Sequence, residues 1–129
     1  MTRTALDLSR EEWRTYQPGK VIARRREKVD ARLEARWQRA RHLAQLAAQI
    51  LRKDFGAEKV VLFGSSTSHH RFTNWSDVDL AAWGIPDDRF FSAVAAVSDL
   101  SPDIKIDLVD PEICSPNLRE VIEQDGVEL

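Results

Sequence analysis

Several features that define whole classes of proteins are scarce or missing in this sequence. Its single cysteine, Cys114, excludes an internal disulfide and any zinc site built from several cysteines. The longest apolar runs, at 60–63 and 93–97, are far shorter than the roughly 20 residues of a membrane-spanning helix. The first residues contain no apolar segment of the secretory type. We therefore expect a cytoplasmic protein without a membrane-spanning segment.

What remains is a small chain of ordinary globular composition with an uneven distribution of charge. Its 129 residues, 43% apolar and 31% charged, suit one domain with a modest core. The net charge of −2 combines +8 over residues 1–53 (14 Lys and Arg, 6 Asp and Glu) with −10 over residues 54–129 (5 and 15). The basic part fits an acidic partner, a phosphate-bearing ligand or a solvated helix face, and the acidic part fits solubility or a cation site.

A long helix is predicted over 20–53, where neither Pro nor Gly occurs and helix-forming residues dominate. Before it, Ser9 and Glu12 form a capping box for a helix that Pro18 and Gly19 end. Apolar residues recur along 20–53 at helical spacing, and basic residues do so on a second face. These basic residues are Arg25, Lys28, Arg32, Arg36 and Arg39. At a rise of about 1.5 Å per residue the helix would be roughly 50 Å long, so its first half is expected to project or to dock on something else.

After the long helix the pattern changes to short strands that alternate with helices. Runs of β-branched and aromatic residues predict strands at 59–63, 77–83 and 103–109. Acidic first-turn residues and a Ser-Pro start predict helices at 87–98 and 116–124. This α/β (α+β) order predicts a small mixed sheet flanked by helices.

Two carboxylates stand in the sequence Asp77-Val-Asp79, at the start of a predicted strand. Strand side chains alternate between faces, so both carboxylates are expected on one face. Two like charges side by side repel each other unless a cation lies between them, and Mg²⁺ prefers such oxygen ligands. Taken alone, the pair is better explained as two carboxylates at a solvent-facing strand start.

A third carboxylate, Asp107, lies in the middle of the predicted strand at 103–109, where Asp is disfavoured. If this strand lies beside the 77–83 strand, Asp107 completes a cluster of three carboxylates. Otherwise it is an exposed residue that pairs with Lys105.

A turn follows the first predicted strand at Phe63-Gly-Ser-Ser66. Glycine permits a sharp turn and a close approach of the backbone, and the start of a following helix offers free amides to phosphate. No Gly-Lys-Ser/Thr follows, so this is not a P-loop. Together, the turn and the three carboxylates predict phosphoryl or nucleotidyl transfer assisted by two metal ions.

The combination resembles a known family. Val60-Val-Leu-Phe-Gly-Ser65, Ser76-Asp-Val-Asp-Leu80 and Lys105-Ile-Asp-Leu-Val109 look like the minimal nucleotidyltransferases (MNT) of the DNA polymerase β superfamily. The resemblance covers about residues 45–129, which we predict to be an MNT domain with the nucleotidyltransferase fold. Residues 1–44 are then a basic helical extension that docks a partner.

The resemblance implies a specific reaction and partner. Such domains bind ATP with Mg²⁺, two ions being expected, and transfer the nucleotidyl group to a hydroxyl. Stand-alone members are antitoxins that neutralise a HEPN-domain ribonuclease toxin by AMPylating one of its tyrosines, and they form hetero-oligomers with it. Asp77, Asp79 and Asp107 would hold the metals, with Asp107 also orienting or deprotonating the attacking hydroxyl.

The same resemblance places the terminal phosphates of ATP at Gly64, Ser65 and Ser66. The family usually continues Gly-Ser with Arg-Ala-Arg-Gly, whereas this chain has Ser66-Thr-Ser-His-His70 followed by Arg71. Arg71 is predicted to supply the missing positive charge.

Two further interpretations of the sequence remain open. In one, the chain is a non-catalytic antitoxin that neutralises its partner by complex formation through the N-terminal helix. In the other, the basic stripe binds nucleic acid, although a solvated face or a dock for an acidic toxin fits a chain of net charge −2 at least as well. Among the aromatic residues, Trp37 is expected in the core, and Trp75 is expected either to stack on a base or, more conservatively, to pack.

Overall fold

The computed structural model describes residues 18–129, with side chains from residue 25 onward, and the capping box at Ser9 lies outside these residues. The chain divides into two units after Arg32, and each is considered by itself. The first unit contributes the beginning of helix α2, which runs from Pro18 to Phe55. Pro18 starts the helix because its missing N–H would have no partner in the first turn. Gly56, at φ +72°, ends it close to the predicted end at residue 53.

The second unit, residues 33–129, contains a four-stranded sheet of order β3-β2-β1-β4. Its strands are β1 (Lys59–Phe63), β2 (Val78–Trp83), β3 (Ile106–Val109) and β4 (Val127–Glu128). The pairs β1–β2 and β1–β4 are antiparallel, whereas β2 and β3 are parallel. The small mixed sheet predicted from the sequence is confirmed, and the short β4 was not predicted.

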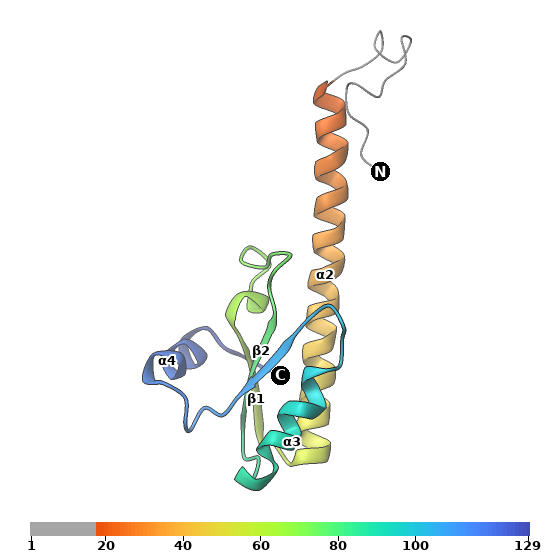
Figure 1. The fold of residues 1–129 in the computed structure, drawn as a ribbon. Coiled ribbons are helices and arrows are strands. Elements are labelled where there is room, and N and C mark those ends of the chain that lie inside the picture. The colour runs from red at the N-terminus through yellow and green to blue at the C-terminus, as the bar shows by residue number, and fades with distance from the viewer. Residues whose placement is uncertain (1–17) are drawn as a thin grey trace. The chain divides into compact units, whose positions relative to one another are not determined.

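Helices cover both faces of this sheet (Figure 1). Residues 33–55 of α2, with α3 (Asp87–Ser98), pack on one face, and α4 (Pro116–Asp125) packs on the other. Strand alternation decides which side chains meet which helix. In β2, Val78 and Leu80 are fully buried in the α2/α3 core, while Ala81 belongs to the smaller core under α4.

The part of α2 within the second unit is bound to the sheet by small side chains. Ala40, Ala44 and Ala47 are fully buried, and Trp37 packs against the same core, as expected. The compact unit therefore begins before residue 45, where the sequence predicts the catalytic domain to begin. Of the helices in residues 18–129, none is both long and apolar enough to cross a membrane.

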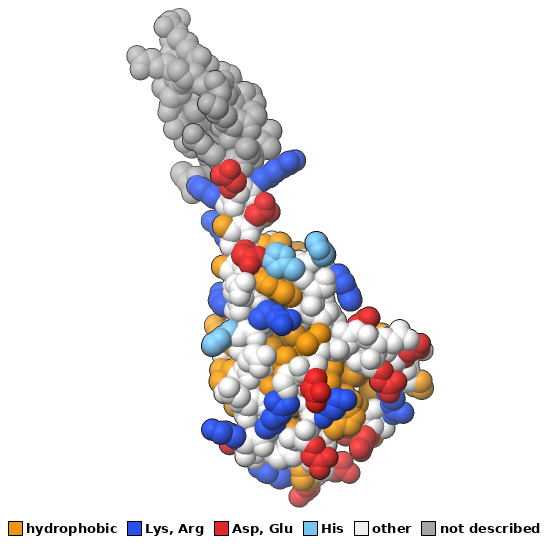
Figure 2. Space-filling view, turned by 180° about the vertical axis from the view of Figure 1, so that it is seen from behind, with side chains coloured by type: hydrophobic (Ala, Val, Ile, Leu, Met, Phe, Trp, Pro, Cys, Tyr) orange, Lys and Arg blue, Asp and Glu red, His pale blue; other side chains and the backbone are white. Residues whose placement is uncertain are grey.

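Charged side chains are mixed over the surface of the second unit. Figure 2 shows basic and acidic side chains interspersed with hydrophobic ones on the face turned away from the view of Figure 1. Arg36 and Arg39 belong to the predicted basic stripe, and both contact Asp103 of their own domain. Arg36 donates to the carbonyl of Asp103, and Arg39 donates to its carboxylate. This part of the stripe is therefore not a purely solvated face.

Candidate active site

The turn after β1 begins at Gly64, in a conformation that favours glycine. Its φ is +79°, and a Cβ built there would lie 2.6 Å from Oδ2 of Asp79. A side chain at position 64 would therefore collide with this carboxylate. The absence of one lets the backbone of the turn, which continues as the 3-10 segment η2 (Gly64–Thr67), lie directly against Asp79.

The register of the sheet brings the predicted carboxylates together. Asp79 in β2 is the direct partner of Asp107 in the parallel strand β3, so both side chains leave the sheet on the same face. Asp77 precedes β2 and stands two residues before Asp79, and the amide of Val78 donates to the carbonyl of Lys105 (2.9 Å). All three aspartates are half-buried. They lie on the face that carries α4, opposite to α2 and α3.

The electrostatics of this cluster show that the charges interact. Burial, followed by repulsion from Asp107 and Asp77, raises the pKa of Asp79, and Lys105 acts in the opposite direction. The ammonium of Lys105 lies 3.2 Å from Oδ1 of Asp107. The predicted pairing of Asp107 with Lys105 is thus observed, and Asp107 also lies in register with Asp79, while its part in a metal-binding cluster stays a prediction.

The donor set suits a hard cation in chemistry and charge, since Asp79 borders the glycine turn and is repelled by the carboxylates of Asp77 and Asp107. Among the side chains of residues 25–129, however, no three His, Cys, Asp or Glu residues come close enough to hold one metal ion as they stand. Lys105 provides the positive charge nearest to Asp107. A bound divalent ion would have to replace that charge and draw the carboxylates together.

The serines of the turn have different surroundings. Ser66 is fully buried, and its Oγ has no hydrogen-bond partner within the described part of the chain. Ser65 is half-buried, and its carbonyl accepts from the amide of Ser68 (3.4 Å). Thr67 donates its hydroxyl to the carbonyl of Gly64 (2.7 Å), which closes the turn on itself. Phe63, the residue before η2, provides no side-chain cap for its first amides.

Among the described residues, no contact joins Arg71 to the carboxylates. Its side chain is exposed and makes no hydrogen bond or ion pair with residues 25–129, while its amide donates to the carbonyl of Ser68 (3.1 Å). The proposed contact with phosphate stays a prediction.

The loop that carries Arg71 is bound to α2 by two aromatic contacts and an ion pair. His69 pairs with Glu34 and lies edge-on to Trp37, with ring centroids 5.1 Å apart. The buried ring of Phe72 meets Trp37 in the same manner at 5.3 Å. Sequence reasoning did not find this anchor, because His69 and Glu34 are far apart in the chain.

Trp75 is the most exposed large hydrophobic residue described, at 89%. The conservative expectation that it packs is therefore wrong. Its amide donates to Oγ1 of Thr73 (3.2 Å), and the next residue, Ser76, is buried, so the backbone that presents the indole is held in place. Two residues span at most about 7 Å of chain, which puts Trp75 beside Asp77.

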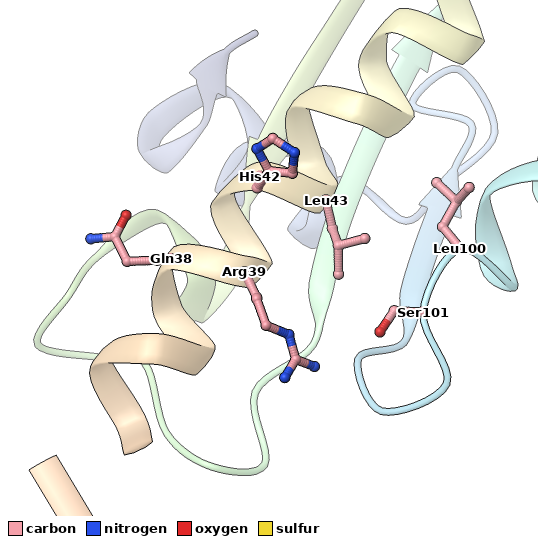
Figure 3. A pocket seen from close by; sticks show the side chains of 6 residues that line it. All are labelled: Gln38, Arg39, His42, Leu43, Leu100 and Ser101. Carbon is pink, nitrogen blue, oxygen red and sulfur yellow. The ribbon is translucent and has the colours of Figure 1, made fainter. Parts of the chain in front are cut away.

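A separate hollow of about 470 Å³ lies between α2 and the chain that follows α3 (Figure 3). Its lining residues are Gln38, Arg39, His42, Leu43, Leu100 and Ser101. Leu43 and Leu100 belong to the core between the sheet and α2/α3. The hollow is thus on the face opposite to the three aspartates and is not part of their site.

Comparison with known proteins gives matches at the level of structure. No protein-family model and no curated protein matches the chain. A solved structure described as a toxin–antitoxin with AMP-PNP aligns with a TM-score of 0.53 and 21% identity, over 66% of this chain and 70% of the matched one. A mutant of the toxin–antitoxin MntA-HpeT aligns with a TM-score of 0.52 and 22% identity, over 66% and 69%. This chain has their fold. The fold expected from the resemblance to nucleotidyltransferases is therefore confirmed.

Proposed function

We propose that the protein is a Mg²⁺-dependent nucleotidyltransferase of the MNT type that acts as an antitoxin. It transfers AMP from ATP to a tyrosine hydroxyl of a HEPN-type toxin, with which it forms a hetero-oligomer in the cytoplasm. One observation carries the proposal: the bend at Gly64 lies against Asp79, and Asp79 is in register with Asp107. The similar structures support it, since both are described as toxin–antitoxin and one contains the ATP analogue AMP-PNP.

Each residue has a defined part in this reaction. Asp77, Asp79 and Asp107 would hold Mg²⁺, which when bound neutralises the triphosphate and supports charge in the transition state. The backbone at Gly64 and the hydroxyls of Ser65 and Ser66 would bind the terminal phosphates, with Arg71 as the predicted cationic contact. The Oγ of Ser66 is buried without a partner in the described residues, so the turn would have to shift for this hydroxyl to reach a phosphate.

The chemical step requires Asp107 to leave Lys105. The tyrosine oxygen attacks the α-phosphorus, and its proton passes to the carboxylate of Asp107. The new bond joins this oxygen to the α-phosphorus, and the bond from the α-phosphorus to the bridging oxygen breaks, so that pyrophosphate leaves. Asp107 is suited to this part by its position, because it is in register with Asp79 on the same face of the sheet.

The test uses the protein purified with its toxin and ATP labelled in the α-phosphate. We expect label on the toxin and a mass gain of one AMP. Asp88→Asn is the matched control for asparagine substitutions at Asp77 and Asp79, since Asp88 is exposed at the start of α3, on the other face of the sheet. A toxin that carries no label in the wild-type complex, with ATP and Mg²⁺ present, contradicts the proposed transfer.

A non-catalytic antitoxin is the second candidate. Two features favour it: residues 66–69 stand where the family usually has Arg-Ala-Arg-Gly, and Lys105 pairs with Asp107. In this alternative the toxin is blocked by complex formation alone. Such a protein would neutralise its partner without binding ATP.

The exposure of Trp75 leads to a prediction about nucleotide affinity. Trp75→Ala should change the free energy of unfolding by no more than about 0.5 kcal/mol, because the side chain is exposed. If the indole stacks on the base of ATP, affinity should fall about fivefold to one hundredfold, since one stacking contact contributes about 1–3 kcal/mol. Calorimetry with AMP-PNP and Mg²⁺ measures this.

Phe91→Ala is the matched control for Trp75→Ala. Phe91 is equally free of burial, at 87% exposure, but belongs to α3 on the opposite face of the sheet. Equal nucleotide affinities for both variants would rule out stacking. If Trp75→Ala weakens binding of the toxin but leaves nucleotide affinity unchanged, the indole belongs to the surface that contacts the partner.

A further inference from the structure

Arg36 joins α2 to both chain segments that lead into the carboxylate strands. Its Nη2 donates to the carbonyl of Ser76 (3.0 Å), and its Nη1 donates to the carbonyl of Asp103 (3.0 Å). These carbonyls are separated by more than 25 residues of sequence, and they come together at one guanidinium. The side chain is half-buried, so the two bonds are partly shielded from water.

Both contacts are close to the candidate metal ligands. Ser76 directly precedes Asp77, and Asp103 is four residues before Asp107. Just beyond the guanidinium, the amide of Val78 bonds to the carbonyl of Lys105 at 2.9 Å. The spacing of the two segments is thus fixed by Arg36 on the helix side and by the strand ladder on the other.

Neighbouring contacts hold the same two segments. Ser76 is 7% exposed, and its Oγ accepts from the amide of Thr73 (2.8 Å). The carboxylate of Asp103 pairs with Arg39 and accepts from the hydroxyl of Ser101 (2.8 Å). Among the described side chains, only Arg36 makes hydrogen bonds to both segments.

The chemistry of the guanidinium explains why arginine stands here. Its planar fork presents several N–H donors at fixed angles, and two of them meet two carbonyls at once. A lysine ammonium is a flexible point charge and does not reproduce this geometry. The Nε of Arg36 is buried without a partner in the described residues, so the two Nη contacts are the hydrogen bonds that hold the group.

We propose that Arg36 is a positioning residue that sets the distance between the Asp77–Asp79 pair and Asp107. It touches neither nucleotide nor acceptor, and it acts through the backbone of the segments that carry the carboxylates. The proposal rests on the proposed function, in which these aspartates hold the metal. The site then includes Arg36 of the N-terminal helix, which lies outside the predicted catalytic domain of residues 45–129.

The test compares Arg36→Lys and Arg36→Gln with Arg39→Lys in the full chain bound to its toxin. Arg39 is the matched control, because it lies one turn along α2 and binds the side chain of Asp103 rather than a carbonyl. Three quantities are measured: hydrogen exchange of the Val78 amide, affinity for Mn²⁺ by electron paramagnetic resonance, and kcat with KM for ATP.

Both Arg36 variants should exchange the Val78 amide faster and bind Mn²⁺ about tenfold more weakly, the usual effect of losing a group that orients metal ligands. The fall in transfer should appear mainly in kcat, with Arg39→Lys close to wild type. Wild-type exchange and Mn²⁺ affinity in both Arg36 variants would overturn the positioning role, even if their melting temperature falls. A wild-type protein that binds no Mn²⁺ would instead overturn the proposed function. The exchange rate of the Val78 amide would still test whether Arg36 holds the two segments together.

Discussion

Replacing Asp77 and Asp79 together by asparagine should reduce AMP transfer about 1,000-fold or more. The two amides keep the size of the carboxylates but remove the charge that binds a divalent ion. Loss of that ion removes several kcal/mol of transition-state stabilisation, and each 1.36 kcal/mol is a factor of ten in rate. The measurement is label from ATP on the co-purified toxin. Full labelling by the double variant would contradict the assignment of these residues.

The same substitution at Asp79 alone should make the metal-free protein more stable near neutral pH. The pKa of Asp79 is raised above its ordinary 3.8 in the folded protein, so its ionised form opposes folding at higher pH. Below pH 3.8 the group is protonated in both states and this cost disappears. Asp79→Asn should therefore melt a few degrees higher than wild type at pH 7, and the difference should shrink as the pH falls through the raised pKa.

Divalent ions provide the complement to this stability measurement. If Mg²⁺ binds the folded wild type as proposed, it should raise the melting temperature of the wild type and leave that of Asp79→Asn unchanged. Like charges held together for a function cost stability when no cation lies between them, and the metal-free protein is expected to show this cost at Asp79. A lower melting temperature for metal-free Asp79→Asn than for wild type at pH 7 would contradict this account of the cluster.

Gly64→Ala is expected to damage both the fold and the reaction. Alanine at φ +79° costs about 1–2 kcal/mol, and its Cβ would meet Oδ2 of Asp79 at 2.6 Å. Asp79 must then move, so we expect transfer to fall at least about tenfold beyond any effect of unfolding, since small displacements of reacting groups have large effects on rate. Urea denaturation and the transfer assay measure the two effects separately.

Gly56→Ala provides a close control for this variant. Gly56 also has a positive φ, +72°, but a Cβ there would meet nothing within 4 Å. It should therefore show the loss of stability due to backbone conformation without the loss of activity. If the two alanine variants retain the same activity, the contact between Gly64 and Asp79 has no part in the reaction.

Much of the fold was predictable because local patterns and tertiary packing agree. The alternation in 104–109 predicts Ile104, Ile106 and Leu108 on one face, and all three are buried in the α2/α3 core. Gly56 ends α2 as its backbone preference allows, whereas Pro18 and Gly19, expected to end a preceding helix, are the first residues of α2. The strand β4 was missed because its two residues are too few to show any periodicity.

The site was predictable in its residue types and only in part in its contacts. Asp79 and Asp107 were expected to meet if their strands were neighbours, and the parallel register of β2 and β3 supplies that condition. The contacts of Arg36 and of His69 with distant segments have no local signal, since they depend on how α2 lies on the sheet. Trp75 was conservatively expected to pack, but it is exposed on a loop in which the amide of Thr73 donates to Oγ of Ser76.

Calorimetric titration of the wild-type protein with AMP-PNP, with Mg²⁺ and again with EDTA, tests most directly whether the three aspartates and the turn at Gly64 form a cation-dependent nucleotide site. We predict binding of one nucleotide with Mg²⁺, little or none with EDTA, and none with the double asparagine variant at positions 77 and 79. The absence of binding heat in the wild type, or equal affinity with and without Mg²⁺, would contradict the account and favour neutralisation by complex formation alone.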